Sequence, residues 1–97
     1  MNAKVIRKEL DGTVEAFEFS GTSAGGKSLD TKSCRFLVKN FTENAIYVDF
    51  EEFEDEDDAI KIPANTAQVC LCQERGVQEL TDTIYVLGTG EVEVQAL

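Results

Sequence analysis

Hydrophobic and polar residues alternate over short stretches of this chain, and turn-forming residues separate the stretches. Alternation predicts β-strands, because successive side chains of a strand point to opposite faces of a sheet. The predicted strands, in chain order, are Lys4 to Leu10, Thr13 to Phe19, Cys34 to Lys39, Ala45 to Phe50, Ala59 to Ile62, Thr66 to Gln73, Thr83 to Leu87 and Glu91 to Gln95. One short turn of helix is expected, at Val77 to Leu80.

Two connections between these strands carry strong turn signals. Asp11-Gly12 separates the first two strands, and this dipeptide suits a type I′ turn, whose two central residues both need positive φ. Gly88-Thr89-Gly90 separates the last two strands in the same way. We therefore predict a β-hairpin at each of these positions.

The third and fourth strands offer the clearest candidates for a core. Their inward-facing positions are predicted to be Phe36, Val38, Ile46, Val48 and Phe50. The connection between them, Asn40 to Asn44, holds Asn and Thr side chains that can close turns onto the backbone. It also contains a glycosylation sequon, Asn40-Phe41-Thr42, which we predict to be idle because nothing in the chain indicates secretion.

The strand Thr66 to Gln73 has apolar residues on both faces. Val69 and Leu71 point one way, and Cys70 and Cys72 point the other. Such a strand is typical of the interior of a sheet or of a contact between subunits.

Sheet edges attract other strands, so the residues at the two ends of the chain are informative. Lys4, Arg7 and Lys8 could block the edge of the first strand, because charged side chains discourage the addition of another chain. The final residues, Glu91 to Leu97, alternate without such protection. We expect them to be able to pair with a neighbouring subunit.

About seven to eight short antiparallel strands separated by turns indicate an all-β fold. The expected architecture is an antiparallel β-sandwich, jelly-roll-like, or a small barrel. With 97 residues, of which 42% are hydrophobic, the chain is expected to form a single domain, residues 1–97, around its own core.

Cysteine content argues against a disulfide framework or a zinc site. The three cysteines, Cys34, Cys70 and Cys72, are an odd number, and the chain has no histidine. A structural zinc ion needs four Cys or His ligands. We therefore expect the cysteines to be small apolar residues of the core.

Charge is the least ordinary part of the composition. The formal net charge is −10, and all of it belongs to the second half of the chain. Such a molecule is repelled by phosphate backbones, so nucleic acid is not an expected partner. The chain has neither a membrane-spanning apolar run nor an apolar leader, so we expect no membrane partner and a cytoplasmic location at synthesis.

The acidic segment Glu51 to Asp58 is predicted to be a solvated loop, because its carboxylates repel one another. Calcium binding is the functional alternative, since hard cations need several carboxylate oxygens. The segment lacks the regular acidic spacing and the central glycine of a calcium loop, so no metal ligand is assigned.

Residues Gly21 to Ser28 read GTSAGGKS and match the phosphate-binding P-loop pattern. A working P-loop needs a buried strand before it and a helix that begins at its lysine. The residues after Ser28 alternate like a strand, and the chain has no room for repeated βα units. We therefore predict a flexible connection with Lys27 in solvent, no cofactor and no catalytic residue, and we keep nucleotide binding only as a third hypothesis.

Several segments together resemble the small structural proteins encoded in phage and prophage head or tail gene clusters of Gram-positive bacteria. These segments are LDGTVEAFEFSGTS, FLVKNFTENAIYVDF, IKIPANTAQV and IYVLGTGEVEVQ. The resemblance implies a non-enzymatic virion protein, such as a head decoration, a head fibre or a tail-associated module, located in the virion. Its implied partners are other virion proteins or further copies of itself, in a homo-oligomer.

The alternative from another class is a ligand-binding β-domain, in particular one for carbohydrate. Carbohydrate sites usually present aromatic faces, and this chain has no tryptophan and only two tyrosines, Tyr47 and Tyr85. That composition favours the interaction module over the carbohydrate-binding domain.

Overall fold

The computed structural model describes residues 5–22, 28–30, 33–54, 56–76 and 80–97. Its strands are β1 (Val5–Glu18), β2 (Ser20–Thr22), β3 (Ser28–Asp30), β4 (Arg35–Asn40), β5 (Ile46–Asp49), β6 (Ile60–Ile62), β7 (Ala67–Leu71) and β8 (Thr83–Ala96). Two short 3-10 helices, η1 (Glu56–Asp58) and η2 (Cys72–Arg75), complete the described elements. No helix among these residues is long and apolar enough to cross a membrane.

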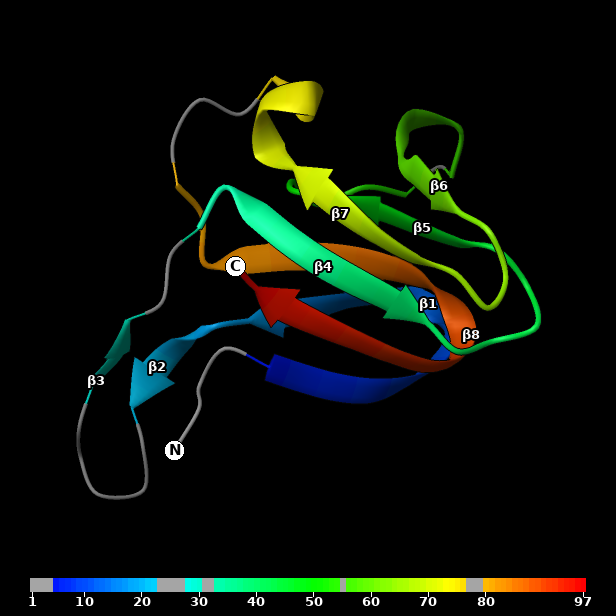
Figure 1. Ribbon diagram of the computed structural model, residues 1–97, viewed down its shortest axis with the longest axis horizontal. Coiled ribbons are helices and arrows are strands. Elements are labelled where there is room, and N and C mark those ends of the chain that lie inside the picture. Colours follow the sequence, from blue (N-terminus) through cyan, green and yellow to red (C-terminus); the bar gives the residue numbers. More distant parts are fainter. Residues whose placement is uncertain (1–4, 23–27, 31–32, 55, 77–79) are drawn as a thin grey trace.

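A long antiparallel ribbon of β1 and β8 organises the fold. Val5 faces Gln95 at one end of the ribbon, and Glu18 faces Thr83 at the other. Both strands have 14 residues and turn back on themselves near the middle, so the ribbon forms two arms (Figure 1). The remaining strands of the main sheet attach to one arm or the other.

The first half of β8 lies between β1 and β5, and β6 lies beside β5. The second half of β8 lies between β1 and β4, and β7 lies beside β4. All these pairings are antiparallel, and together they form a nearly closed, barrel-like sheet. The predicted all-β class is therefore confirmed, and the structure is compatible with both a small barrel and a sandwich.

The predicted hairpin at Asp11-Gly12 is wrong. The chain reverses there, but the two halves of β1 pair with β8 and not with each other. Gly12 has a positive φ of 94°, whereas Asp11 is not among the residues with positive φ, so the type I′ turn does not form. Instead the register shifts between Asp11 and Val14, and Asp11 Oδ1 accepts hydrogen bonds from the Thr13 amide at 3.1 Å and the Thr13 hydroxyl at 2.6 Å. The dipeptide forms a β-bulge within a bend.

The predicted hairpin at Gly88-Thr89-Gly90 is wrong for a related reason. These residues lie inside β8, and Gly90 and Thr89 face Leu10 and Asp11 across the ribbon. A Cβ on Gly88 would lie 2.6 Å from Ile46 Cγ2. The glycines therefore let β8 bend as one continuous strand close to β5. The β-bulge in β1, which lies opposite, bends at the same place.

The core fills the space between the two arms of the ribbon. All five predicted inward positions are buried, and the Phe36 ring packs against Phe19 and Phe50 with ring centres 5.5 and 5.8 Å apart. The last strand contributes Val92 and Val94, both fully buried, as their alternation with glutamate predicts.

Asn40 is a buried polar residue that joins two loops. Its amide nitrogen donates to the carbonyl oxygens of Asn44 and Pro63, both at 2.9 Å, and its Oδ1 accepts the Thr42 amide at 2.9 Å. Such bonds are needed because an unpaired buried amide is costly. The side chain that glycosylation of the sequon would modify is only 2% exposed.

The P-loop string lies on a small separate hairpin of β2 and β3, in which Gly21 faces Leu29 and Thr22 faces Ser28. Ser28 begins a strand where a P-loop would continue as a helix. The predicted flexible connection spans Gly21 to Ser28, but its ends are strand residues, Gly21 and Thr22 in β2 and Ser28 in β3. The rest of it, residues 23–27 with the prediction of Lys27 in solvent, lies outside the described residues.

The predicted helical turn at Val77 to Leu80 also falls largely on residues outside the described part, 77–79. The described helical turn comes earlier, as η2, which ends at Arg75 and is capped by Gly76, whose φ is 81°. A glycine with positive φ is a common helix C-terminus.

Candidate functional site

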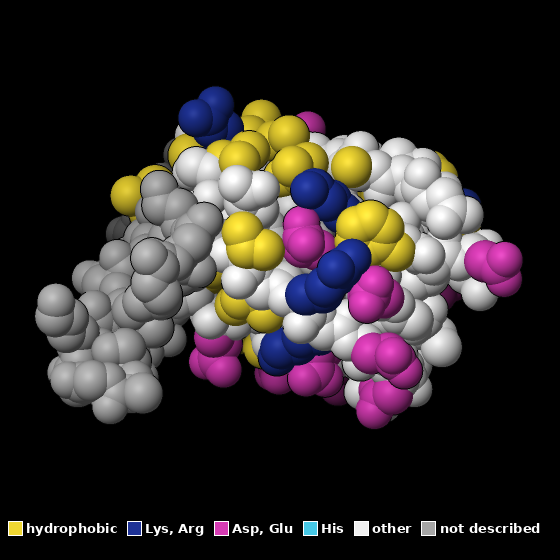
Figure 2. Space-filling model, turned by 60° about the horizontal axis from the view of Figure 1, so that its bottom comes forward, with side chains coloured by type: hydrophobic (Ala, Val, Ile, Leu, Met, Phe, Trp, Pro, Cys, Tyr) yellow, Lys and Arg dark blue, Asp and Glu magenta, His cyan; other side chains and the backbone are white. Residues whose placement is uncertain are grey.

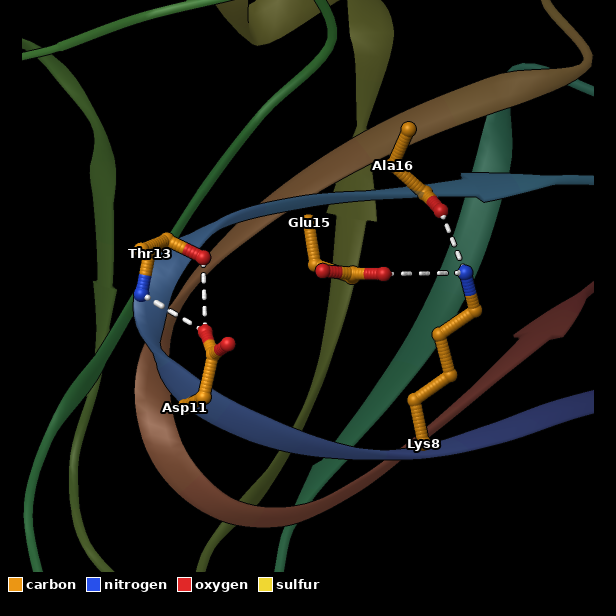
Figure 3. Close-up of polar contacts among 5 residues, drawn as sticks. All are labelled: Lys8, Asp11, Thr13, Glu15 and Ala16. Atoms are coloured by element: carbon orange, nitrogen blue, oxygen red, sulfur yellow. Dashed lines mark hydrogen bonds and ion pairs between the residues drawn. The ribbon is translucent and has the colours of Figure 1, made fainter.

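The outer edge of β1 is closed by one of its own side chains. Among the described strands, β1 pairs only with β8, so its other side is an edge of the sheet. Lys8, on one arm of β1, donates to the carbonyl oxygen of Ala16 on the other arm at 2.8 Å and lies 3.5 Å from Glu15 Oε1 (Figure 3). This lysine occupies a backbone acceptor that an added strand would use, and inward-pointing charges are a known protection of edges.

Of the other predicted edge blockers, Arg7 points to the outer face of the sheet and Lys4 lies outside the described residues. The prediction that Glu91 to Leu97 would be an unprotected edge is wrong. The second half of β8 has β1 on one side and β4 on the other, so it is central. The reason is non-local, because β1 comes from the opposite end of the chain.

Strand β7 is not in the interior of a sheet. Among the described strands of the main sheet it is bonded to β4 alone. Its cysteine, Cys70, points inward and is fully buried, as is Cys72, which begins η2, while Val69 on the outer side of β7 is 44% exposed. Of the two settings expected for a strand with two apolar faces, the interior of a sheet is therefore wrong.

A row of three apolar residues and one glutamine crosses the outer side of this arm of the sheet. Val5 on β1 faces Gln95 on β8, which faces Leu37 on β4, which faces Val69 on β7. These residues alternate with the buried ones of each strand, so they share the outer side. We call Val5, Gln95, Leu37 and Val69 the apolar row.

Charged residues beside the apolar row are paired across the strands. Lys39 Nζ lies 3.1 Å from Glu93 Oε2, and Arg7 Nη2 lies 3.2 Å from Glu91 Oε2. The Arg7 guanidinium also lies over the Phe41 ring, 4.8 Å from its centre. Blue and magenta side chains therefore alternate with yellow ones on this side of the molecule (Figure 2).

Charge on this side is balanced. Among the described residues of β1, β4 and β8 on this arm, up to the bend at Asp11, the outward cations are Arg7, Arg35 and Lys39, and the outward acids are Glu9, Glu91 and Glu93. The chain as a whole carries a net charge of −10. We call this side, with the apolar row and these six charged residues, the balanced face.

The other arm of the sheet carries a groove on its outer side, with a volume of about 930 Å³. Its floor is formed by Val14 and Ala16 of β1 and by Tyr85 and Leu87 of β8. Its wall is the first half of the acidic loop, from Glu51 to Glu54. We call this surface the acidic groove.

The acidic loop joins β5 to β6, as predicted, but it also shapes this groove. Glu51, Glu52 and Glu54 are exposed, whereas the Phe53 side chain between them is half-buried. Beside the loop, Asp49 accepts from Arg75, with Arg75 Nη2 and Asp49 Oδ2 3.2 Å apart. Among the described residues, no three acidic, cysteine or histidine side chains are placed together to hold a metal ion.

The thiols of Cys70 and Cys72 are core groups, as predicted. Both side chains are fully buried, and burial raises the pKa of Cys70 to about 12, with a further contribution from the nearby Glu74 charge. Burial also raises the pKa of Cys72. The reactive form of cysteine is the thiolate, so neither group is prepared for nucleophilic chemistry at neutral pH.

The raised pKa of Cys70 makes stability depend on alkaline pH. An unfolded thiol loses its proton near pH 8.5, whereas the folded Cys70 keeps its proton up to about pH 12. Between these values the folded state binds more protons, so the free energy of unfolding falls as pH rises, by at most about 1.4 kcal/mol per pH unit from this group. Urea unfolding under reducing conditions at a series of pH values above 8 measures this slope.

The matched variant is Cys70→Ala, which removes the thiol and should make the slope shallower. Tyrosines and lysines titrate in the same way in both proteins, so their effect cancels in the difference. Equal slopes in the two proteins would contradict the assignment of alkaline sensitivity to Cys70.

Comparison of the chain with protein-family models gives no match, and comparisons with curated proteins and with solved structures give none either.

Proposed function

We propose that the protein is a non-enzymatic structural module that binds further copies of itself through the balanced face. The observation that supports this proposal is the apolar row on the outer side of β1, β8, β4 and β7. Val5 and Val69, at its two ends, are 38% and 44% exposed. Burying such side chains against another chain is favourable in proportion to the apolar area removed from water.

Electrostatics favour a second copy as the occupant of this face. Two molecules that each carry a net charge of −10 repel each other in most orientations. On the balanced face three cations meet three acids, so two copies can approach there with little repulsion. A contact of one face with the same face of another copy also gives a closed, two-fold arrangement.

The resemblance to phage and prophage structural proteins supplies a biological setting for the proposal. A virion contains many copies of one protein in contact, and a small module with a self-complementary face suits a head or tail assembly. Other virion proteins are the alternative occupants of the same face.

Light scattering over a range of protein concentrations tests the proposal. The wild-type protein should form dimers or larger closed oligomers, and Val69→Lys should weaken the association about tenfold or more, because it places an unpaired charge in the apolar row. The matched control is Leu80→Lys, since Leu80 is 60% exposed and lies outside the balanced face. The control should associate like the wild type.

Circular dichroism of each variant shows whether it remains folded. A wild-type protein that is monomeric at the highest attainable concentration would contradict self-association. Equal weakening by Val69→Lys and Leu80→Lys would contradict the role of the balanced face.

A further inference from the structure

We propose that the acidic groove binds a basic, extended segment of a different protein. The groove lies on the opposite arm of the sheet from the balanced face, so this inference is independent of self-association. Its argument rests on the charge of its lining, the nature of its floor and the closure of the neighbouring strand edge.

The charge of the lining requires a cationic partner. The described residues that line the groove include four acids, Asp49, Glu51, Glu52 and Glu54, and no lysine or arginine. Arg75 pairs with Asp49 from outside this lining, with Nε 3.4 Å from Oδ1 and Nη2 3.2 Å from Oδ2. The three glutamates of the wall are exposed. Their three carboxylates therefore attract positively charged groups of a partner.

The floor fits the aliphatic part of lysine and arginine side chains. Val14, Ala16 and Leu87 present half-buried apolar surface, and Tyr85 presents a half-buried ring beside them. Long basic side chains lay their methylene groups on apolar surface while the charged ends reach towards acids. The tyrosine ring adds a favourable position for a cation, since cations are attracted to aromatic faces.

The partner is expected to bind through its side chains and not as an added strand. Ala16 lies in the floor of the groove, and its carbonyl oxygen is already bonded to Lys8 Nζ at 2.8 Å. The β1 edge beside the groove is therefore closed at this point. The affinity should therefore depend on the basic side chains of the segment. In sites where a peptide adds a strand to a sheet, by contrast, main-chain hydrogen bonds supply the affinity.

The net charge of a second copy opposes its use as the cationic partner. Arg7 and Lys39 are paired with Glu91 and Glu93 on the balanced face, and the whole chain carries a net charge of −10. A separate protein with a Lys- or Arg-rich segment is the partner whose charge complements the groove.

The test uses fluorescence anisotropy with a labelled peptide of alternating lysine and alanine, at low and at moderate salt. The wild-type protein should bind it, more weakly as salt rises. The triple variant Glu51→Gln, Glu52→Gln, Glu54→Gln should lose about tenfold in affinity. Tyr85→Leu keeps an apolar floor and should lose affinity severalfold through the missing ring.

The matched control is the triple variant Glu18→Gln, Glu43→Gln, Glu74→Gln, which makes the same change in net charge at exposed positions outside both the groove lining and the balanced face. It should bind within about twofold of the wild type, because screened charges at a distance contribute little. A peptide of alternating glutamate and alanine should not bind.

Three results would overturn the proposal. One is the absence of binding of the lysine–alanine peptide to the folded wild-type protein. Another is an equal loss of affinity in the two triple variants, which would assign binding to the net charge of the molecule. The third is displacement of the peptide by spermine at an equal concentration of charge, which would make the groove a site for small polycations.

Discussion

Replacing Phe36 with alanine is expected to lower the free energy of unfolding by about 3–5 kcal/mol. Phe36 is fully buried on β4, and its ring lies between Phe19 and Phe50, which come from different parts of the chain. Removing the ring loses its burial and leaves a cavity that the bent ribbon cannot easily collapse around. Urea unfolding followed by circular dichroism measures the change.

The matched control is Phe41→Ala, one residue beyond the end of β4. Phe41 is 46% exposed and contacts the Arg7 guanidinium on the surface. Its replacement should cost about 1 kcal/mol or less, because nearly half of its surface already meets water. Similar losses in the two variants would mean that the space between the two arms is not the stabilising core.

Gly90→Ala is expected to lower the free energy of unfolding by about 3 kcal/mol. Two costs combine at this position. Gly90 has a φ of 115°, which side-chain-bearing residues rarely adopt, and an added Cβ would lie 2.7 Å from Thr42 Cγ2. Either the bend of β8 or the position of the Asn40–Asn44 loop must change. Chemical denaturation again provides the measurement.

Gly76→Ala separates the two costs. Gly76 also has a positive φ, of 81°, but nothing lies within 4 Å of an added Cβ. It should lose only about 1 kcal/mol, the cost of the backbone conformation alone. If Gly90→Ala were no worse than Gly76→Ala, the close passage of β8 over Thr42 would not be a structural requirement.

The all-β class and much of the core could be predicted from the sequence because burial follows the two-residue period of a strand. Phe36 and Val38, and later Val92 and Val94, face inward wherever their strands are placed. The period is a local property, so it survives errors in strand pairing. Cys70 could be assigned to the core for a different reason, because free cysteine is usually a buried apolar residue, whereas the period of its strand is apolar on both faces.

The pairing of the strands beside the two glycine-containing turns could not be predicted. A glycine indicates that the chain can turn, but it does not specify which strands pair with the strands on either side of it. Asp11-Gly12 and Gly88-Thr89-Gly90 lie opposite each other in one ribbon, at the bend of both strands. Each signal reported a true reversal of the chain. The partner of each strand, however, comes from the other end of the sequence, and such pairing leaves no local mark.

The apolar row and the acidic groove also depend on which strands pair with each other. The apolar residues on both faces of β7, with Val69 among them, predicted the interior of a sheet or a contact between subunits, whereas β7 lies at the end of the strand order and Val69 is exposed. The apolar row could not be predicted, because its four residues lie side by side only once the register of four strands is known. The acidic groove needed the first half of β8 beside β1, which sets Tyr85 and Leu87 next to Val14 below the acidic loop.

The pairing of β1 with β8 also bears on the order in which the protein can fold during synthesis. β1 leaves the ribosome early, but its partner follows about 80 residues later, after every other described strand. Contacts that span such a separation form slowly, and unpaired strands are prone to aggregate meanwhile. Lys8 and Glu15 place opposite charges on β1, which remains unpaired until β8 has been synthesised. These charges therefore reduce the tendency of β1 to aggregate in the nascent chain, and they also protect its edge in the folded sheet.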